Sequence, residues 1–83
     1  MPKSRGPDAE AVFLELVREI RTEAGLRQQD VADRLGQPQS VVSKYESGDR
    51  RLDVLELREI CAACNLTLAE FARRLERKLG GSG

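Results

Sequence analysis

Residues 28–48 read QQDVADRLGQPQSVVSKYESG, and this stretch decides the fold. Its first eight residues place three apolar side chains on one face of a short helix: Val31, Ala32 and Leu35. Gly36 follows directly, at the place where a left-handed residue that ends a helix is least costly. Pro38 suits the first position of a new helix, because its φ is fixed and its missing N–H would be unpaired there. The pattern predicts two short helices joined by a tight turn.

The second of these helices, expected over about 38–46, has two unlike sides. At about 100° per residue, one side is apolar and is expected in the core: Pro38, Val41, Val42 and Tyr45. The other side carries one amide, three hydroxyls and one amine: Gln39, Ser40, Ser43, Lys44 and Ser47. Such groups suit base edges in the major groove of DNA, although a solvated helix face is the simpler alternative. The small Ala32 favours the close helix crossing of a helix-turn-helix, and we therefore prefer the DNA interpretation.

A resemblance supports this interpretation. Residues 26–53, LRQQDVADRLGQPQSVVSKYESGDRRLD, look like the DNA-binding domain of the Cro/C1 (phage repressor, Xre) family, above all in QSVVSKYESGDRRLD. The likeness extends over roughly 12–75 and implies an all-α fold, a compact five-helix lambda-repressor-like domain with its helix-turn-helix at helices 2 and 3. Two residues depart from the family pattern. Arg27 replaces a usual Ser, Thr or Asn and so removes a good N-cap, and Gln37 replaces an apolar residue of the turn.

The resemblance also implies what each polar residue does. Four residues of the third helix are expected to contact bases: Gln39, Ser40, Ser43 and Lys44. Five are expected to contact phosphates: Arg21, Gln28, Ser47, Arg50 and Arg51. Gln28 would do so together with the free amides at its helix N-terminus. Arg21 would also pair with Glu46, the alternative being an exposed arginine of little energetic weight.

Composition limits the class of protein. The chain of 83 residues is long enough for one small domain. It has no Trp, no long apolar run and no signal-like start, so we expect a soluble cytoplasmic protein without a membrane segment. Fourteen basic and fourteen acidic residues cancel. Acids dominate 8–25 and 52–70, whereas 26–51 and 71–83 are net basic, which predicts a polarised field with a positive DNA-facing side.

Chemistry other than binding has little support in the sequence. Cys61 and Cys64 form a CxxC, but inside a helical pattern and with no His in the chain. We interpret them as core or half-buried thiols, with redox sensing or a metal shared by two chains as the alternative. We expect no cofactor, no metal site and no catalytic residues, and hence no enzyme, because nucleophile–base groupings and phosphate-binding glycine loops are lacking.

The other helices follow from their apolar spacing. A helix from an Asp8 cap to about Glu23 carries Val12, Phe13, Leu16, Val17, Ile20 and Ala24. A fourth helix, between an Asp53–Glu56 capping box and Asn65, is expected to pack against the first and third through Leu52, Leu55, Leu57, Ile60, Cys61 and Cys64. A Thr67–Glu70 capping box opens a fifth, with Leu68, Phe71, Ala72, Leu75 and Leu79.

Three segments and one function follow. Residues 1–7, with Lys3 and Arg5, are expected to be a flexible basic arm, 8–79 the helix-turn-helix domain, and 80–83 a linker or cloning remnant. The predicted function is a sequence-specific double-stranded DNA-binding transcriptional regulator, a repressor acting as a homodimer on a palindromic operator. The last helix is expected to pair with a second copy. The alternative is a protein-interaction module of the same fold, such as an antitoxin or adaptor.

Overall fold

Five helices make up the computed structural model, which describes residues 7–80. They are α1 (Pro7–Glu23), α2 (Gln28–Leu35), α3 (Gln39–Ser47), α4 (Val54–Ala63) and α5 (Leu68–Gly80). No strand occurs within 7–80, so the predicted all-α, five-helix fold with its helix-turn-helix at α2 and α3 is confirmed. Lys3 and Arg5 of the expected arm, and 81–83 of the expected tail, lie outside the described residues. Gly80, the first residue of that expected tail, is the last residue of α5.

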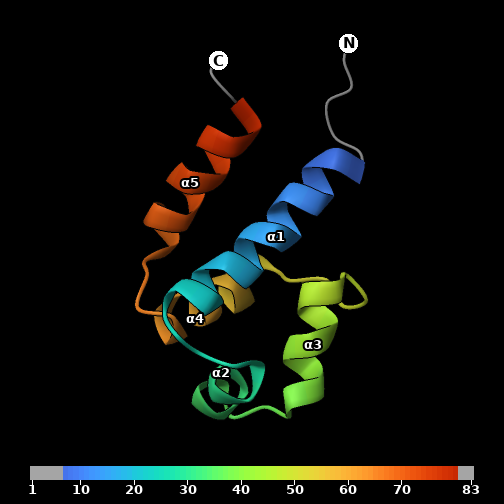
Figure 1. Ribbon diagram of the computed structural model, residues 1–83, viewed down its shortest axis with the longest axis vertical. Helices are drawn as coiled ribbons and strands as arrows, with labels where there is room; N and C mark the ends of the chain where they lie inside the picture. The colour runs from blue at the N-terminus through green and yellow to red at the C-terminus, as the bar shows by residue number, and fades with distance from the viewer. Residues whose placement is uncertain (1–6, 81–83) are drawn as a thin grey trace.

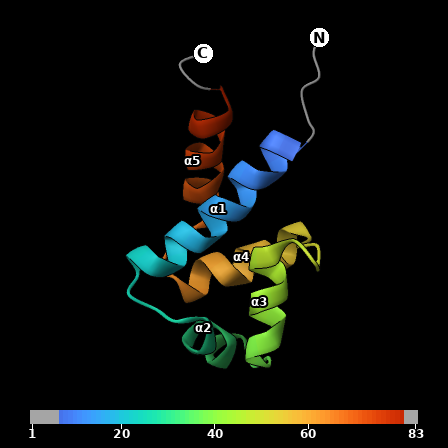
Figure 2. The ribbon, with the colours of Figure 1, turned by 45° about the vertical axis from the view of Figure 1, so that its right-hand side comes forward.

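The helices divide the molecule into two ends. α1 runs through the middle (Figure 1), and α5 packs against it, with ion pairs to Glu19 and Glu23 in the second half of α1. α2 and α3 occupy the opposite end, away from the first turn of α1 and the last turn of α5 (Figure 2). α4 crosses behind α1 and packs chiefly against α2 and α5. The helix-turn-helix therefore stands at one end of the molecule with its outer side uncovered by other helices.

The core draws on all five helices. Its buried side chains are Leu16, Val17, Ile20, Val31, Ala32, Val42, Tyr45, Leu57, Ile60, Cys61, Ala63, Cys64 and Phe71. Phe13 and Phe71 meet edge to face, with ring centroids 5.9 Å apart, and fasten α5 to α1. Ala32 of α2 is fully buried, which agrees with the close helix crossing expected from its small side chain. The apolar stripes read from the sequence are thus the inner faces of these helices.

Pro38 is the first departure from the predicted core. It is exposed, and its ψ of 152° is extended, so it precedes α3 as the N-cap residue and is not its first helical residue. A proline N-cap offers no side-chain acceptor to the first free N–H groups of the helix. The apolar side of α3 therefore reduces to Val42 and Tyr45, with Val41 partly buried.

α4 is the second departure, since it does not pack chiefly against α1 and α3 as expected. Its buried positions repeat at helical spacing and face α2, α5 and the core: Leu57, Ile60, Cys61 and Cys64. Leu55 precedes Leu57 by two residues, which is about 200° around a helix. Leu55 therefore faces outward, and it is 68% exposed, beside Val54 at 61%. Ala72 of the predicted α5 stripe is likewise exposed.

The helix ends follow the predicted chemistry. Gly36 has φ +70°, and the N–H groups of Gly36 and Gln37 donate to the carbonyls of Asp33 and Ala32, which is a Schellman turn. Gln37, which replaces an apolar residue of the family pattern, is exposed and completes that turn through its backbone N–H. Both predicted capping boxes are present, Asp53 with Glu56 and Thr67 with Glu70. α1 begins at Pro7, one residue before the predicted Asp8 cap.

Charged side chains hold α5 along α1. Arg74 Nη2 lies 2.8 Å from a Glu23 carboxylate oxygen, and Lys78 Nζ lies 3.5 Å from Glu19. These pairs are partly exposed, so each contributes under about 1 kcal/mol.

The α3 exit turn predicts a specific cost for Gly48→Ala. Gly48 has φ +87°, and a Cβ there would lie 3.0 Å from Leu14 Cδ1. The left-handed backbone costs an alanine about 1–2 kcal/mol, and displacing Leu14 from its rotamer adds roughly 0.5–1.5 kcal/mol. Gly25→Ala is the matched control, since Gly25 has φ +75° with open space around it. Urea unfolding should show the larger loss for Gly48→Ala, and equal losses would contradict this packing.

Candidate nucleic-acid interface

The outer side of α3 carries the residues expected to read bases. Gln39, Ser40, Lys44 and Ser47 are exposed, and Ser43 is partly buried. Val42 and Tyr45 turn inward from the same helix and anchor it in the core. A rigid helix therefore presents a row of amide, hydroxyl and amine groups at the surface.

Glu46 lies at the centre of the polar contacts beneath this surface. It is the one buried charged residue among those described, with 4% of its side chain exposed. Arg21 of α1 binds it through two nitrogens, Nε to Oε2 at 2.6 Å and Nη2 to Oε1 at 3.0 Å. This is a bidentate, charge-assisted pair, stronger than a neutral hydrogen bond. The pairing of Arg21 with Glu46 that the resemblance implied is present.

From Glu46 a chain of hydrogen bonds reaches the surface of α3. Gln28 of α2 donates its side-chain Nε2–H to Glu46 Oε1 at 3.0 Å. Gln39 in turn donates from Nε2 to Gln28 Oε1 at 2.6 Å. The carboxylate of α3 thus connects the first residue of α2 to the first residue of α3. The sequence predicts separate roles for Gln28 and Gln39 and gives no sign of this bond, since an 11-residue separation leaves no local signal.

Both glutamine amides keep donors or acceptors that these hydrogen bonds do not use. A glutamine amide has two N–H donors and an oxygen acceptor. Gln39 gives one donor to Gln28, so its second donor and its oxygen stay available. Gln28 likewise keeps a second donor after its bond to Glu46. The two side chains are held in place without losing the capacity to bind a ligand.

Arg21 itself is mostly engaged within the protein. Besides Glu46, its Nη1 donates to the Leu26 carbonyl at 3.0 Å, and its side chain is only 13% exposed. Arg18, one turn earlier on α1, has its Nε 3.9 Å from Glu46 and is 57% exposed. Arg18 is not among the phosphate contacts predicted from the sequence, although its place one helical turn from Arg21 is a usable signal.

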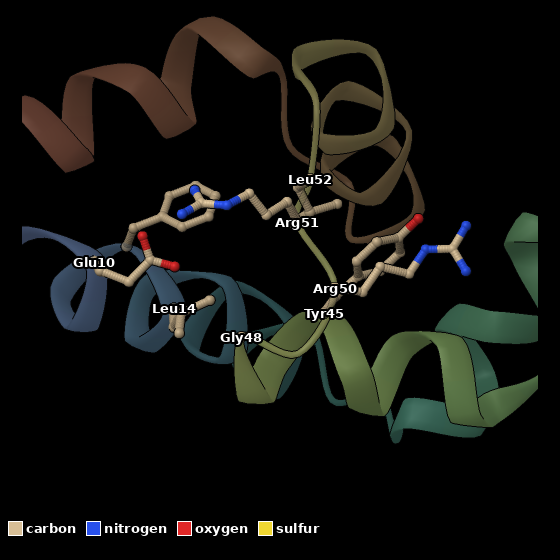
Figure 3. Close-up of a pocket in the computed structure, with 8 residues that line it drawn as sticks. Glu10, Leu14, Tyr45, Gly48, Arg50, Arg51 and Leu52 are labelled. Carbon is tan, nitrogen blue, oxygen red and sulfur yellow. The ribbon is translucent and has the colours of Figure 1, made fainter. Parts of the chain in front are cut away.

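Arg50 and Arg51, after α3, point in opposite directions (Figure 3). The Arg50 guanidinium carbon lies 5.5 Å from the centroid of the Tyr45 ring, a cation–π contact. Arg51 extends back over α1 toward Glu10, along a small hollow of about 50 Å³. Burial and the nearby Glu56 carboxylate raise the pKa of Tyr45, so its hydroxyl stays protonated near neutral pH. The two arginines are both exposed, but their side chains do not lie together.

Ser47 and Arg27 serve the ends of their helices. Ser47 Oγ donates to the Lys44 carbonyl at 3.2 Å and accepts from the Asp49 N–H at 3.4 Å. Arg27 has no acceptor and cannot cap α2, but Asp30 accepts its backbone N–H at 2.8 Å and pairs with its guanidinium. The hydrogen bonds from Arg27 lower the pKa of Asp30 to about 2. With Arg27 in place of the usual N-cap residue, α2 therefore lacks one of the two hydrogen bonds of a capping box and keeps the other, from the Arg27 N–H to Asp30.

The two cysteines are buried in the core at the end of α4. Both are free thiols, and burial raises the pKa of Cys61 to about 11 and also raises that of Cys64. Thiolates are the reactive form, so these groups are poorly suited to redox sensing. Among the described residues, no group of three His, Cys, Asp or Glu side chains gathers as for a metal ion.

Thiol labelling tests the burial of Cys61 and Cys64. At pH 8 the folded protein should react with a thiol-specific disulfide reagent at least about tenfold more slowly than the urea-unfolded chain, because reaction needs an opening of the core. The unfolded chain is the control and should release two equivalents of product, one for each cysteine. Rapid reaction of either thiol in the folded protein would return redox sensing to consideration.

Comparisons with known proteins agree with this geometry. A family model described as helix-turn-helix, of the Cro/C1 type, matches residues 17–71. A solved structure of an XRE-family like protein from Pseudomonas syringae pv. tomato str. DC3000 is similar, with a TM-score of 0.80 and 38% identity. The match covers 86% of this chain and 87% of that one. No curated protein gives a significant match. None of the helices within 7–80 is long and apolar enough to span a membrane.

Proposed function

Since this chain belongs to the Cro/C1-type (XRE) helix-turn-helix family, we propose that it is a sequence-specific regulator of transcription that reads the DNA major groove with α3. The observation that carries the proposal is the outer side of α3, where an amide and several hydroxyls stand at the surface of a helix anchored by Val42 and Tyr45. A repressor is the form we favour, because a domain that occupies an operator blocks polymerase without further parts.

Base reading is assigned to four residues of α3. Gln39 keeps one N–H and its oxygen free, which is the pair of groups that binds adenine N7 and N6 at once. Ser40, Ser43 and Lys44 follow along the same side and would contact neighbouring bases or phosphates. The bond that Gln39 donates to the Gln28 oxygen fixes the plane of the Gln39 amide before DNA binds, so less side-chain entropy is lost on binding.

Phosphate contacts fix the register on the duplex. We assign them to Gln28, Ser47, Arg50 and Arg51, together with the remaining donors of Arg21. Because Arg50 and Arg51 point apart, they would reach different phosphates. We add Arg18 to this set, because it is exposed and its Nε lies 3.9 Å from Glu46, too far for a hydrogen bond.

The working form that we propose is a homodimer on a palindromic operator in the cytoplasm. Two-fold symmetric domains of this kind place their reading helices in successive major grooves, about 34–36 Å apart. The zero net charge, fourteen bases against fourteen acids, favours a second candidate, a protein-binding module such as an antitoxin or adaptor. Retention on random duplex at low salt separates the two, since a module that does not bind DNA would show none.

Operator binding of Gln39→Ala and Arg50→Ala tests the division of roles. Gln39→Ala should relax the preference at one base position by roughly 1–3 kcal/mol, because a bidentate base contact is lost. Arg50→Ala should weaken binding to all sequences alike and flatten the salt slope by about one unit. Fluorescence anisotropy on an operator selected from a random pool, and on its single-base variants, gives both quantities.

The control for this pair is Arg77→Ala on α5, which is exposed and carries no assigned DNA contact. It should leave affinity, base preference and salt slope unchanged. If Gln39→Ala and Arg50→Ala changed binding in the same way on every sequence, the assigned roles would be wrong.

A further inference from the structure

The outward side of α4 is not covered by any other helix of residues 7–80. It consists of five exposed residues at helical spacing: Val54, Leu55, Arg58, Glu59 and Ala62. Val54 and Leu55 are two of the three large apolar side chains that stand exposed among the described residues. Arg58 and Glu59 form no ion pair within 9–80. We call this surface the α4 outer face.

A hollow of about 530 Å³ lies at the far end of the same face. It is lined by Leu35 and Arg34 of α2 and by Glu59, Ala62 and Ala63 of α4. An apolar cavity of about 150 Å³ holds a benzene molecule, so this hollow is roomy enough for a leucine side chain. The face thus carries an apolar projection at one end and a partly apolar recess at the other.

These features complement one another when α4 meets a second α4 running in the opposite direction. If the two-fold axis passes between positions 58 and 59, Arg58 of each copy stands opposite Glu59 of the other. In the same register Leu55 stands opposite Ala62, at the recess. Each contact then occurs twice, which is the property of an isologous two-fold interface.

We propose that a second copy of this chain docks on the α4 outer face, with Leu55 entering the hollow beside Ala62 and Arg58 paired with the partner's Glu59. This names the surface of the homodimer proposed above and rests on that part of the proposed function. α5, the helix first expected to pair, is less suitable. Its exposed Leu79, at 48%, follows the exposed cations Arg77 and Lys78. A two-fold axis at Leu79 would bring these cations close to the same cations of the second copy.

Charge reversal tests the pairing of Arg58 with Glu59 of the second copy. The measurement is sedimentation equilibrium of the full chain without DNA. Arg58→Glu alone, or Glu59→Arg alone, places like charges opposite each other twice and should weaken dimerisation at least about tenfold. An equimolar mixture of the two variants should dimerise again, because each interfacial pair then contains one Arg and one Glu. The double variant Arg58→Glu/Glu59→Arg should also be restored.

Two leucine substitutions distinguish the α4 outer face from α5 as the dimer surface. Leu55→Asp should give a monomer with the wild-type far-UV circular dichroism, while Leu79→Asp should leave the dimer intact. A dimer broken by Leu79→Asp and indifferent to the charge reversals would overturn the proposal. So would a mixture that stays monomeric, or a wild type that is monomeric at every concentration.

DNA binding is measured separately, so that the two proposals can fail separately. Wild-type protein that binds random duplex at low salt but never dimerises would overturn the α4 interface and leave DNA binding standing. Protein that follows the charge-reversal pattern but shows no retention on duplex would support the interface and remove the regulator assignment.

Discussion

The buried carboxylate of Glu46 is the constraint on which the rest of the structure depends. An ionised carboxylate with 4% exposure would be very costly without compensating partners. Here it receives two N–H groups from Arg21 and one from Gln28. Since these three residues belong to α3, α1 and α2, the need to neutralise one charge fixes three helices relative to one another. A hydrophobic contact is non-directional and would not do this.

The same carboxylate connects folding to binding. Its contact with Gln28 determines where the Gln28 oxygen lies, and that oxygen receives the Gln39 amide. A reading side chain on the surface is therefore oriented by a charge in the interior, at a distance of two hydrogen bonds. The apolar residues beneath α3 keep the helix in place, whereas the polar chain sets the direction of one side chain on it. Removing one partner of a buried pair leaves the other unpaired, at a cost of about 3–5 kcal/mol.

The fold was largely predictable because its signals are local. Gly36 and Asn65 end their helices with positive φ, and the Thr67–Glu70 and Asp53–Glu56 boxes begin theirs, each within a few residues of sequence. The errors concern tertiary packing. Pro38 and Leu55 are apolar and were expected in the core, but Pro38 is the exposed N-cap residue before α3 and Leu55 lies on the outer side of α4. Sequence periodicity over so few turns does not fix which apolar residues the neighbouring helices reach.

The candidate site was predictable residue by residue but not as an assembly. The outward placement of Gln39 and Lys44 follows from their spacing along one helix. The bond between Gln28 and Gln39, the approach of Arg18 to Glu46 and the divergence of Arg50 from Arg51 depend on how α1, α2 and α3 meet. Those relations become visible only once the three helices are placed together.

A double-mutant cycle between Glu46→Gln and Gln39→Ala is the most direct measurement of the central claim. The quantity is the free energy by which each variant discriminates the operator from its single-base variant at the Gln39 position. If the carboxylate orients Gln39, the two effects overlap, and the cycle gives a coupling energy of about 0.5–3 kcal/mol. Strictly additive effects, with base discrimination intact in Glu46→Gln, would show that the buried charge holds the helices together but does not position the reading side chain.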